Sequence, residues 1–164
     1  MKFQIKFLIF VFTIIVLTSK STGSLAKIVG NKIIFGSTIS LTGKYSSEAL
    51  LFKNNYQRFI DEVNEKQGIE ISGKIYSLDI IFHDNQSNES RANQLTKRLI
   101  QNEGVQFLIG PHNFQLSNEI NKLIEKNQLA IVSSYDALKV YLEAFTKLDT
   151  VDSKKIRKYI ISKN

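Results

Sequence analysis

The sequence of 164 residues contains no cysteine and only two histidines. The absence of cysteine excludes disulfide bonds, so the stability of the fold has to come from packing. With His83 and His112 as the only imidazoles and no thiolate, the composition argues against a zinc site. The polar residues around Asp84 also lack the spacing of a calcium-binding loop. We therefore expect neither a metal ion nor another cofactor.

Catalytic motifs are absent as well. There is no Gly-x-Ser-x-Gly elbow and no Walker loop, and the run Gly36-Ser37-Thr38-Ile39 has the wrong spacing for a dinucleotide fingerprint. The pair His83-Asp84 is explained more simply by a strand end with a loop-capping aspartate than by acid–base chemistry. Internal repeats and low-complexity segments are missing too. The sequence therefore predicts a protein that is not an enzyme.

An excess of positive charge is present, with 22 Lys and Arg against 15 Asp and Glu. Lys2, Lys6 and Lys20 lie in the first 26 residues, where there is no acid. Most of the remaining cations alternate with acids, and no basic stripe is interleaved with aromatic residues. This pattern predicts an ordinary solvated surface and no nucleic-acid partner. The length suits one domain with a core of its own.

The first 26 residues have the three parts of a signal peptide. Lys2 and Lys6 form a charged start, residues 7–17 form an apolar run, and Ser24-Leu25-Ala26 supplies small residues for cleavage. The apolar run is shorter than the ~20 residues of a bilayer span, although an uncleaved anchor is the alternative. No cysteine follows it, which excludes a lipid anchor. We expect a mature chain that begins at Lys27 and is released into the periplasm.

The stretch from Lys32 to Asn64 organises the rest of the chain. Its first eight residues are rich in β-branched side chains and predict a strand. The turn Ser40-Leu41-Thr42-Gly43 follows, and Ser46 or Ser47 is expected to cap a helix. One apolar stripe runs along this helix and consists of Ala49, Phe52, Tyr56, Phe59, Ile60 and Val63. The turn would lie at the carboxyl end of the strand, where open α/β sheets bind ligands.

The remaining elements alternate in the same way. A hairpin is expected around Ser72-Gly73, with strands over residues 77–82, 105–109 and 129–133. Asn88 is expected to cap a second helix that ends at Gly104, and Leu116, Ile120, Leu123 and Ile124 mark a third. Two further helices are expected over residues 135–148 and 154–161. The pattern predicts an α/β fold, a doubly wound parallel sheet with additional C-terminal helices.

Several short motifs, in order, resemble type I periplasmic solute-binding proteins of the branch that serves branched-chain amino acid and amide ABC transporters. They are Ser40-Leu41-Thr42-Gly43, Asp61-Glu62-Val63-Asn64, Lys66-Gln67-Gly68-Ile69, Gly73-Lys74, residues 78–85 and Ile109-Gly110-Pro111. The resemblance implies that residues 27–134 form one flavodoxin-like lobe. Residues 135–164 resemble a late segment of the same family, which implies an internal deletion joined between Ser133 and Asp136.

The resemblance also implies a function: binding an amino acid or amide solute and delivering it, as a monomer, to an ABC permease in the inner membrane. The ligand-binding residues it implies are Thr42, Tyr45, Glu48, His112, Asn113, Phe114, Ser133 and Ser134. Phe114 stands where the family commonly has Ser or Thr, so one hydroxyl for the ligand carboxylate is lost. Two alternatives are a deletion remnant that binds nothing and a flavodoxin-like or receiver-like signalling module. Ser37-Thr38 occupies the place where a receiver needs acidic residues.

Overall fold

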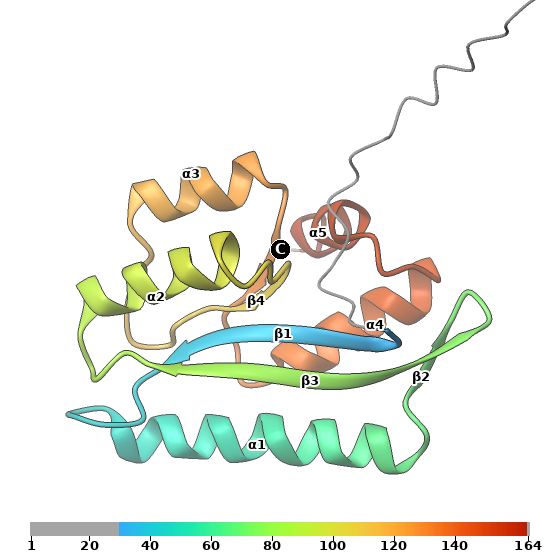
Figure 1. The fold of residues 1–164 in the computed structure, drawn as a ribbon, viewed down its shortest axis with the longest axis horizontal. Helices are drawn as coiled ribbons and strands as arrows, with labels where there is room; N and C mark the ends of the chain where they lie inside the picture. Colours follow the sequence, from blue (N-terminus) through green and yellow to red (C-terminus); the bar gives the residue numbers. More distant parts are fainter. Residues whose placement is uncertain (1–29, 164) are drawn as a thin grey trace, which may run out of the picture.

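The computed structural model describes residues 30–163, so the predicted signal peptide and its cleavage site lie outside the described residues. This part of the chain contains five strands and five helices, arranged as Figure 1 shows. In chain order they are β1 (Lys32–Ile39), α1 (Ser46–Glu65), β2 (Ile69–Ile71), β3 (Lys74–Asp84), α2 (Glu89–Gln101), β4 (Phe107–Ile109), α3 (Asn118–Lys126), β5 (Ala130–Val132), α4 (Ala137–Leu148) and α5 (Ser153–Ile161). Among residues 30–163, no helix is both long enough and apolar enough to cross a membrane.

The five strands form one sheet in the order β2-β3-β1-β4-β5. β1 pairs in parallel with β3 and β4, and β4 pairs in parallel with β5. β2 runs antiparallel to β3 as the predicted hairpin. One long strand, β3, replaces the two shorter strands expected there: its first residues pair with β2 and the rest with β1. No turn former separates Tyr76 from Ser77, so nothing in the sequence breaks the strand. The doubly wound α/β prediction is confirmed.

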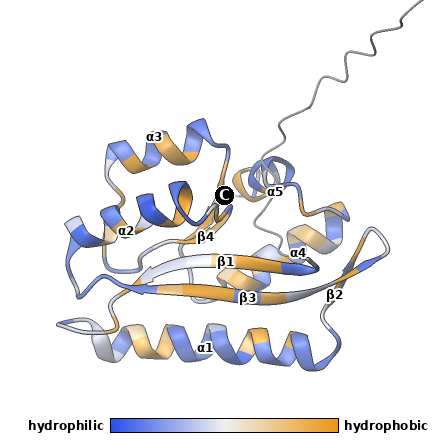
Figure 2. Ribbon diagram, viewed as in Figure 1, coloured by the Kyte–Doolittle hydropathy of each residue, from blue (hydrophilic) through white to orange (hydrophobic). Residues whose placement is uncertain are grey.

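Helices cover both faces of the sheet. In Figure 1, α1 lies on one side and α2 and α3 on the other. Successive residues of a strand point to opposite faces, so Phe107 packs with α1, α4 and α5 while Leu108 packs with α2 and α3. Figure 2 shows apolar stretches along β1 and β3 and mixed polarity on the helices that cover the sheet. Two hydrophobic clusters, one on each face, therefore hold the domain together.

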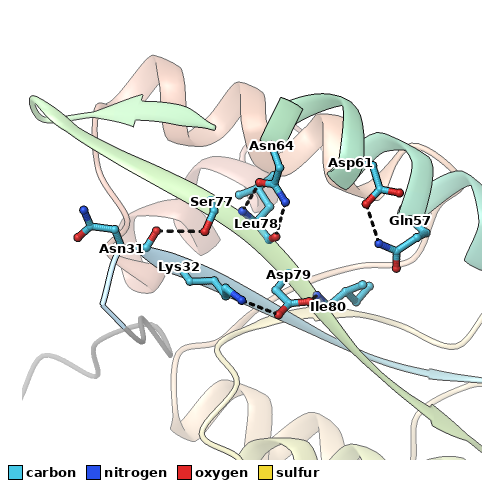
Figure 3. A network of polar contacts seen from close by, with 9 residues as sticks. All are labelled: Asn31, Lys32, Gln57, Asp61, Asn64, Ser77, Leu78, Asp79 and Ile80. Atoms are coloured by element: carbon cyan, nitrogen blue, oxygen red, sulfur yellow. Dashed lines mark hydrogen bonds and ion pairs between the residues drawn. The ribbon is translucent and has the colours of Figure 1, made fainter. Parts of the chain in front are cut away.

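The long helix α1 is fixed to the sheet by apolar and polar contacts. Tyr56 and Ile60 are buried at the centre of the predicted stripe, whereas Phe59 is only half-buried. Near the end of the helix, the Asn64 amide donates to the Leu78 carbonyl at 2.9 Å and its oxygen accepts from the Leu78 N–H at 2.8 Å (Figure 3). A side chain that satisfies both backbone groups of one residue sets the register of the helix against β3.

The prediction that Ser46 or Ser47 caps α1 is wrong. The helix begins after Tyr45, with no side-chain cap from Ser46 or Ser47. Instead, Ser87 in the loop after β3 accepts a hydrogen bond from the Tyr45 N–H at 3.0 Å. Gly43 allows this approach, because it has a φ of +87° and a Cβ there would lie 2.8 Å from the Ser87 hydroxyl. By contrast, Asn88 caps α2 as predicted, accepting from the Arg91 N–H at 2.8 Å.

The C-terminal helices belong to the same core. In α4, Leu138, Tyr141 and Phe145 are buried against the sheet. The Tyr141 ring lies 5.2 Å from that of Phe35, and its hydroxyl donates to the Leu108 carbonyl at 2.8 Å. α5 packs on α4 and β5. The face of the sheet to which Phe107 points is thus covered by α1 and α4 together, which come from opposite ends of the described chain.

Candidate functional site

A small pocket lies at the carboxyl ends of β1 and β4. Four segments meet there, because parallel strands bring the loops that follow them to one edge of the sheet. They are the end of β1, the first turns of α1, the loop after β3 and the loop after β4. The lining residues are Thr38, Ile39, Ser40, Glu48, Ala49, Phe52, Asn85, Pro111, His112, Asn113 and Phe114. The enclosed volume is about 10 Å³, which is room for about one water molecule.

The loop after β3 braces the turn after β1. The Thr42 N–H and hydroxyl donate to the two Asp84 carboxylate oxygens at 3.2 and 2.8 Å. Burial by itself raises the pKa of Asp84, but hydrogen bonds from Gln86 and Thr42 outweigh it and hold the pKa below its usual value. His83 contacts Glu103 at 2.8 Å rather than Asp84. Asp84 therefore acts as the loop cap that the sequence predicted, and not as the partner of His83.

His112 is the most constrained polar residue of the pocket. Its ring stacks on Phe52 with 3.6 Å between centroids, and its Nε2 lies 2.9 Å from the Tyr56 hydroxyl. That hydroxyl donates its only hydrogen to the Ser134 carbonyl at 2.6 Å. Nε2 must therefore carry a hydrogen and donate it to Tyr56, which leaves Nδ1 as an acceptor in the neutral ring.

The electrostatics of the pocket favour the neutral form of His112. Burial lowers the pKa of His112, and the negative charge of Glu48 opposes this only in part. Burial also raises the pKa of Tyr56, with smaller contributions from Asp136 and Tyr135, so the phenol stays protonated. At neutral pH the pair therefore offers a fixed ring with one hydrogen-bond acceptor.

The outer wall combines polar and aromatic groups. The Asn113 amide donates to the Glu48 carboxylate at 3.3 Å. The Phe114 ring meets that of Tyr45 edge to face at 5.6 Å. Deeper in the pocket, the Thr38 hydroxyl is buried and has no hydrogen-bond partner within residues 30–163. A small polar molecule in this pocket would meet an acceptor, a carboxylate, an amide and an unused hydroxyl.

The structure brings together only part of the set predicted from the sequence. Glu48, His112, Asn113 and Phe114 line the pocket. Thr42 and Tyr45 border it, in the turn that Asp84 and Ser87 hold. Ser133 and Ser134 line a different groove, of about 300 Å³, between β5, α4 and α5. The Ser134 carbonyl accepts a hydrogen bond from Tyr56, whose hydroxyl contacts His112 of the pocket.

The predicted ligand-binding set lacked seven of the lining residues, which are Thr38, Ile39, Ser40, Ala49, Phe52, Asn85 and Pro111. Two of them left a signal, because Thr38 and Ser40 are polar residues at the end of a strand that is otherwise buried and apolar. Ser40 uses its hydroxyl to donate to the Asn85 side chain at 2.7 Å, whereas Thr38 does not use its own in this way. Within the described residues, no group of three His, Cys, Asp or Glu side chains is placed to hold a metal ion.

Comparison with known protein families identifies the family of this chain. A family model described as "Periplasmic binding protein" matches residues 32–149, from β1 through α4. The chain belongs to the periplasmic binding protein family. The resemblance recognised from the ordered motifs is thereby confirmed. The alternation of strands and helices, which flavodoxins and receivers share, belongs here to a periplasmic binding protein.

Solved structures show the same fold at low sequence identity. The substrate-binding protein LivJ of Streptococcus pneumoniae, in complex with isoleucine, matches at a TM-score of 0.52 and 20% identity, over 62% of this chain and 28% of its own. A Silicibacter pomeroyi protein assigned to branched-chain amino acid ABC transport matches at 0.53 and 19%, over 72% and 29%. A possible leucine/isoleucine/valine-binding protein from Rhodopirellula baltica matches at 0.50 and 16%, over 73% and 35%. The matches thus span about a third or less of these structures.

Proposed function

We propose that this protein is the solute-binding component of an ABC transport system and presents one half of a site for an amino acid or a small amide. It binds the solute and carries out no reaction. The observation that supports this proposal is the pocket at the carboxyl ends of β1 and β4, where Glu48, His112, Asn113 and the Thr38 hydroxyl converge.

Each group has a role that its chemistry suits. His112 Nδ1 and the Glu48 carboxylate accept hydrogen bonds, so they suit an ammonium or amide N–H. The Thr38 hydroxyl and the Asn113 amide donate, and they suit a carboxylate or carbonyl oxygen. The first turn of α1 begins at the same edge, and a helix amino terminus favours negative charge. Phe52 and Phe114 supply apolar surface for an aliphatic side chain.

The size of the pocket limits the affinity. A good small-molecule site buries about 70–90% of its ligand, whereas this pocket encloses about 10 Å³. Phe114 also lacks the hydroxyl expected at its position. A solute seated here would remain largely open to water on one side. We therefore propose weak binding by this chain alone, with the protein a monomer in the periplasm and the ABC permease of the inner membrane as its partner.

A solute titration followed by NMR tests the proposal. The chain beginning at Lys27 is titrated with leucine, isoleucine, valine and short amides. We expect saturable shifts of the amide signals of Glu48, His112 and Asn113, with a dissociation constant of about 1 mM or weaker, which is ~4 kcal/mol of binding free energy. Asn113→Ala should weaken binding, whereas Asn54→Ala, exposed on α1 and outside the pocket, should not.

Three results would count against the proposal. Unchanged signals at all three positions at saturating solute would favour a deletion remnant that binds nothing. Shifts confined to Ser133 and Ser134 would move the site to the groove beside β5. Micromolar affinity would contradict the half-site and identify the solute directly.

Export is tested by a separate experiment. Amino-terminal sequencing of periplasmic material should give a sequence that begins at Lys27.

A further inference from the structure

Positive charge is concentrated at the end of the chain. All fifteen acidic side chains lie before Ser153. Residues 28–152 contain thirteen Lys and Arg, so this part of the chain is slightly acidic. The twelve residues from Ser153 onward contain no acid and five cations, which are Lys154, Lys155, Arg157, Lys158 and Lys163. The positive net charge of residues 30–163 therefore comes from α5 and from Lys163, which follows it.

The packing of α5 turns this charge outward. Ile156 and Ile160 are buried against α4 and β5, which places the cations on the opposite side of the helix. Lys154, Lys155 and Lys158 are exposed. The Asp152 carboxylate is already used as the cap of the helix, where it accepts from the Lys154 and Lys155 N–H groups at 2.9 and 3.3 Å.

Four of these cations also lack the ion pairs that half of the other cations in residues 30–163 make. Lys32, Arg58, Lys97, Arg98, Lys139, Lys147 and Lys163 each lie within ion-pair distance of an acid. Within residues 30–163, no ion pair involves Lys154, Lys155, Arg157 or Lys158. Their charge is not neutralised by the protein itself and is available to a partner.

The four cations line one side of a groove between α5 and the end of α3. The groove has a volume of about 740 Å³, and Glu125 and Gln128 line its α3 side. Ile161 lies among the cations with 53% of its surface exposed. A cationic surface that also presents an exposed aliphatic side chain suits a partner with negative charge at its surface and apolar groups just beneath it.

We propose that the groove between α3 and α5 docks the protein on a membrane surface rich in anionic phospholipid. Lys and Arg near such a surface each contribute to binding through attraction to the headgroups, and an aliphatic side chain lies at the boundary with the acyl chains. A nucleic acid fits less well, because no aromatic side chain lines the groove for base stacking. The nearby Tyr159 is engaged elsewhere, since its hydroxyl donates to Glu143 at 2.8 Å.

Vesicle sedimentation tests this proposal. The protein begins at Lys27, because both hydrophobic clusters lie within residues 33–160 and are kept intact. It is mixed with neutral phosphatidylcholine vesicles or with vesicles that contain about 30% phosphatidylglycerol. We expect binding to the anionic vesicles only, and a loss of about tenfold between about 0.05 and 0.5 M salt, because salt screens surface charges.

Two triple variants with equal net charge identify the surface. Lys154→Gln, Lys155→Gln and Lys158→Gln together should weaken binding on the order of 100-fold, from about fivefold for each cation. The control replaces Arg58, Lys66 and Lys74 by Gln; these exposed residues lie in α1, just after α1 and at the start of β3. It should change binding by less than about threefold, since these cations lie outside the groove. Circular dichroism melts establish that both variants keep the fold.

Three outcomes would overturn the proposal. Equal binding to neutral vesicles would show that negative headgroups are not recognised. Equal losses in the two triple variants would show that net charge acts without a defined surface. Binding to a DNA duplex of about 20 base pairs without binding to vesicles would make the groove a nucleic-acid surface instead. The groove shares no lining residue with the solute pocket, so solute binding can fail or succeed independently.

Discussion

The Tyr56 hydroxyl in α1 donates a hydrogen bond of 2.6 Å to the carbonyl of Ser134, just after β5. These residues are 78 positions apart in the chain. The same hydroxyl accepts from His112, so one group ties the first helix, the loop after β4 and the entrance to α4 together. The Tyr56 side chain therefore links the candidate site to the entrance of α4.

Removing this hydroxyl should destabilise the fold. Tyr56→Phe leaves the Ser134 carbonyl and the His112 N–H without their partner, and we expect a loss of about 2 kcal/mol in the free energy of unfolding. Urea denaturation measures it. The matched control is Tyr45→Phe, because the Tyr45 ring is half-buried and makes its contacts through the ring. Equal effects of the two substitutions would contradict the role given to Tyr56.

Stability should fall with acidification through His112. Burial lowers the pKa of His112 in the folded protein below its value of 6.5 in the unfolded chain. Between these two pKa values the unfolded state binds more protons, so this contribution is fully present above the unfolded pKa and declines as the pH falls toward the folded pKa.

Unfolding curves at several pH values between about 7.5 and 5 measure this effect. His112→Gln should lose less stability over that window than the parent protein, because Gln does not titrate. The control His83→Gln keeps His112 and should retain its contribution to the loss. An unchanged pH dependence in His112→Gln would show that His112 is not the titrating group.

Burial should rank two phenylalanine substitutions. Phe145 in α4 is fully buried against the sheet, whereas Phe59 in α1 is only half-buried. We expect Phe145→Ala to cost about 3–5 kcal/mol, from lost burial and the cavity left behind. Phe59→Ala should cost about 1–2 kcal/mol, because solvent already reaches part of its ring. Thermal melts that gave the reverse order would show that α4 contributes less to the core than α1 does.

The docking of α4 should protect it from protease. Leu138, Tyr141 and Phe145 bury one side of the helix, and cleavage requires local unfolding that exposes them. We expect trypsin to cut at Lys139 and Lys147 no faster than at Arg58 in the middle of α1. Limited proteolysis followed by mass spectrometry measures these rates. Cleavage beyond Tyr135 at the rate of an unfolded peptide would mean that α4 and α5 do not stay on the sheet.

The sequence by itself determined the features that depend on neighbouring residues. The alternation of strands and helices follows from apolar periodicity. The cap of α2 lies three residues from the N–H that it accepts, and the hairpin turn at Ser72-Gly73 joins strands that directly adjoin it. The doubly wound parallel architecture also followed, because parallel strands joined by helices have few allowed arrangements, whereas the order of the strands in the sheet came from the structure. Short-range signals of this kind do not depend on the rest of the fold.

Only the tertiary structure decided the features that depend on distant residues. Ser87, 42 positions away, holds the start of α1, in place of the two serines that adjoin it. The Thr38 hydroxyl is buried at the pocket, while Ser133 and Ser134 open into a separate groove. The physical reason is the same in each case. Groups that are distant in sequence become neighbours when the chain folds, and their hydrogen bonds and packing can replace the contacts that adjoining residues would make. The outcome depends on which contact the packed core allows.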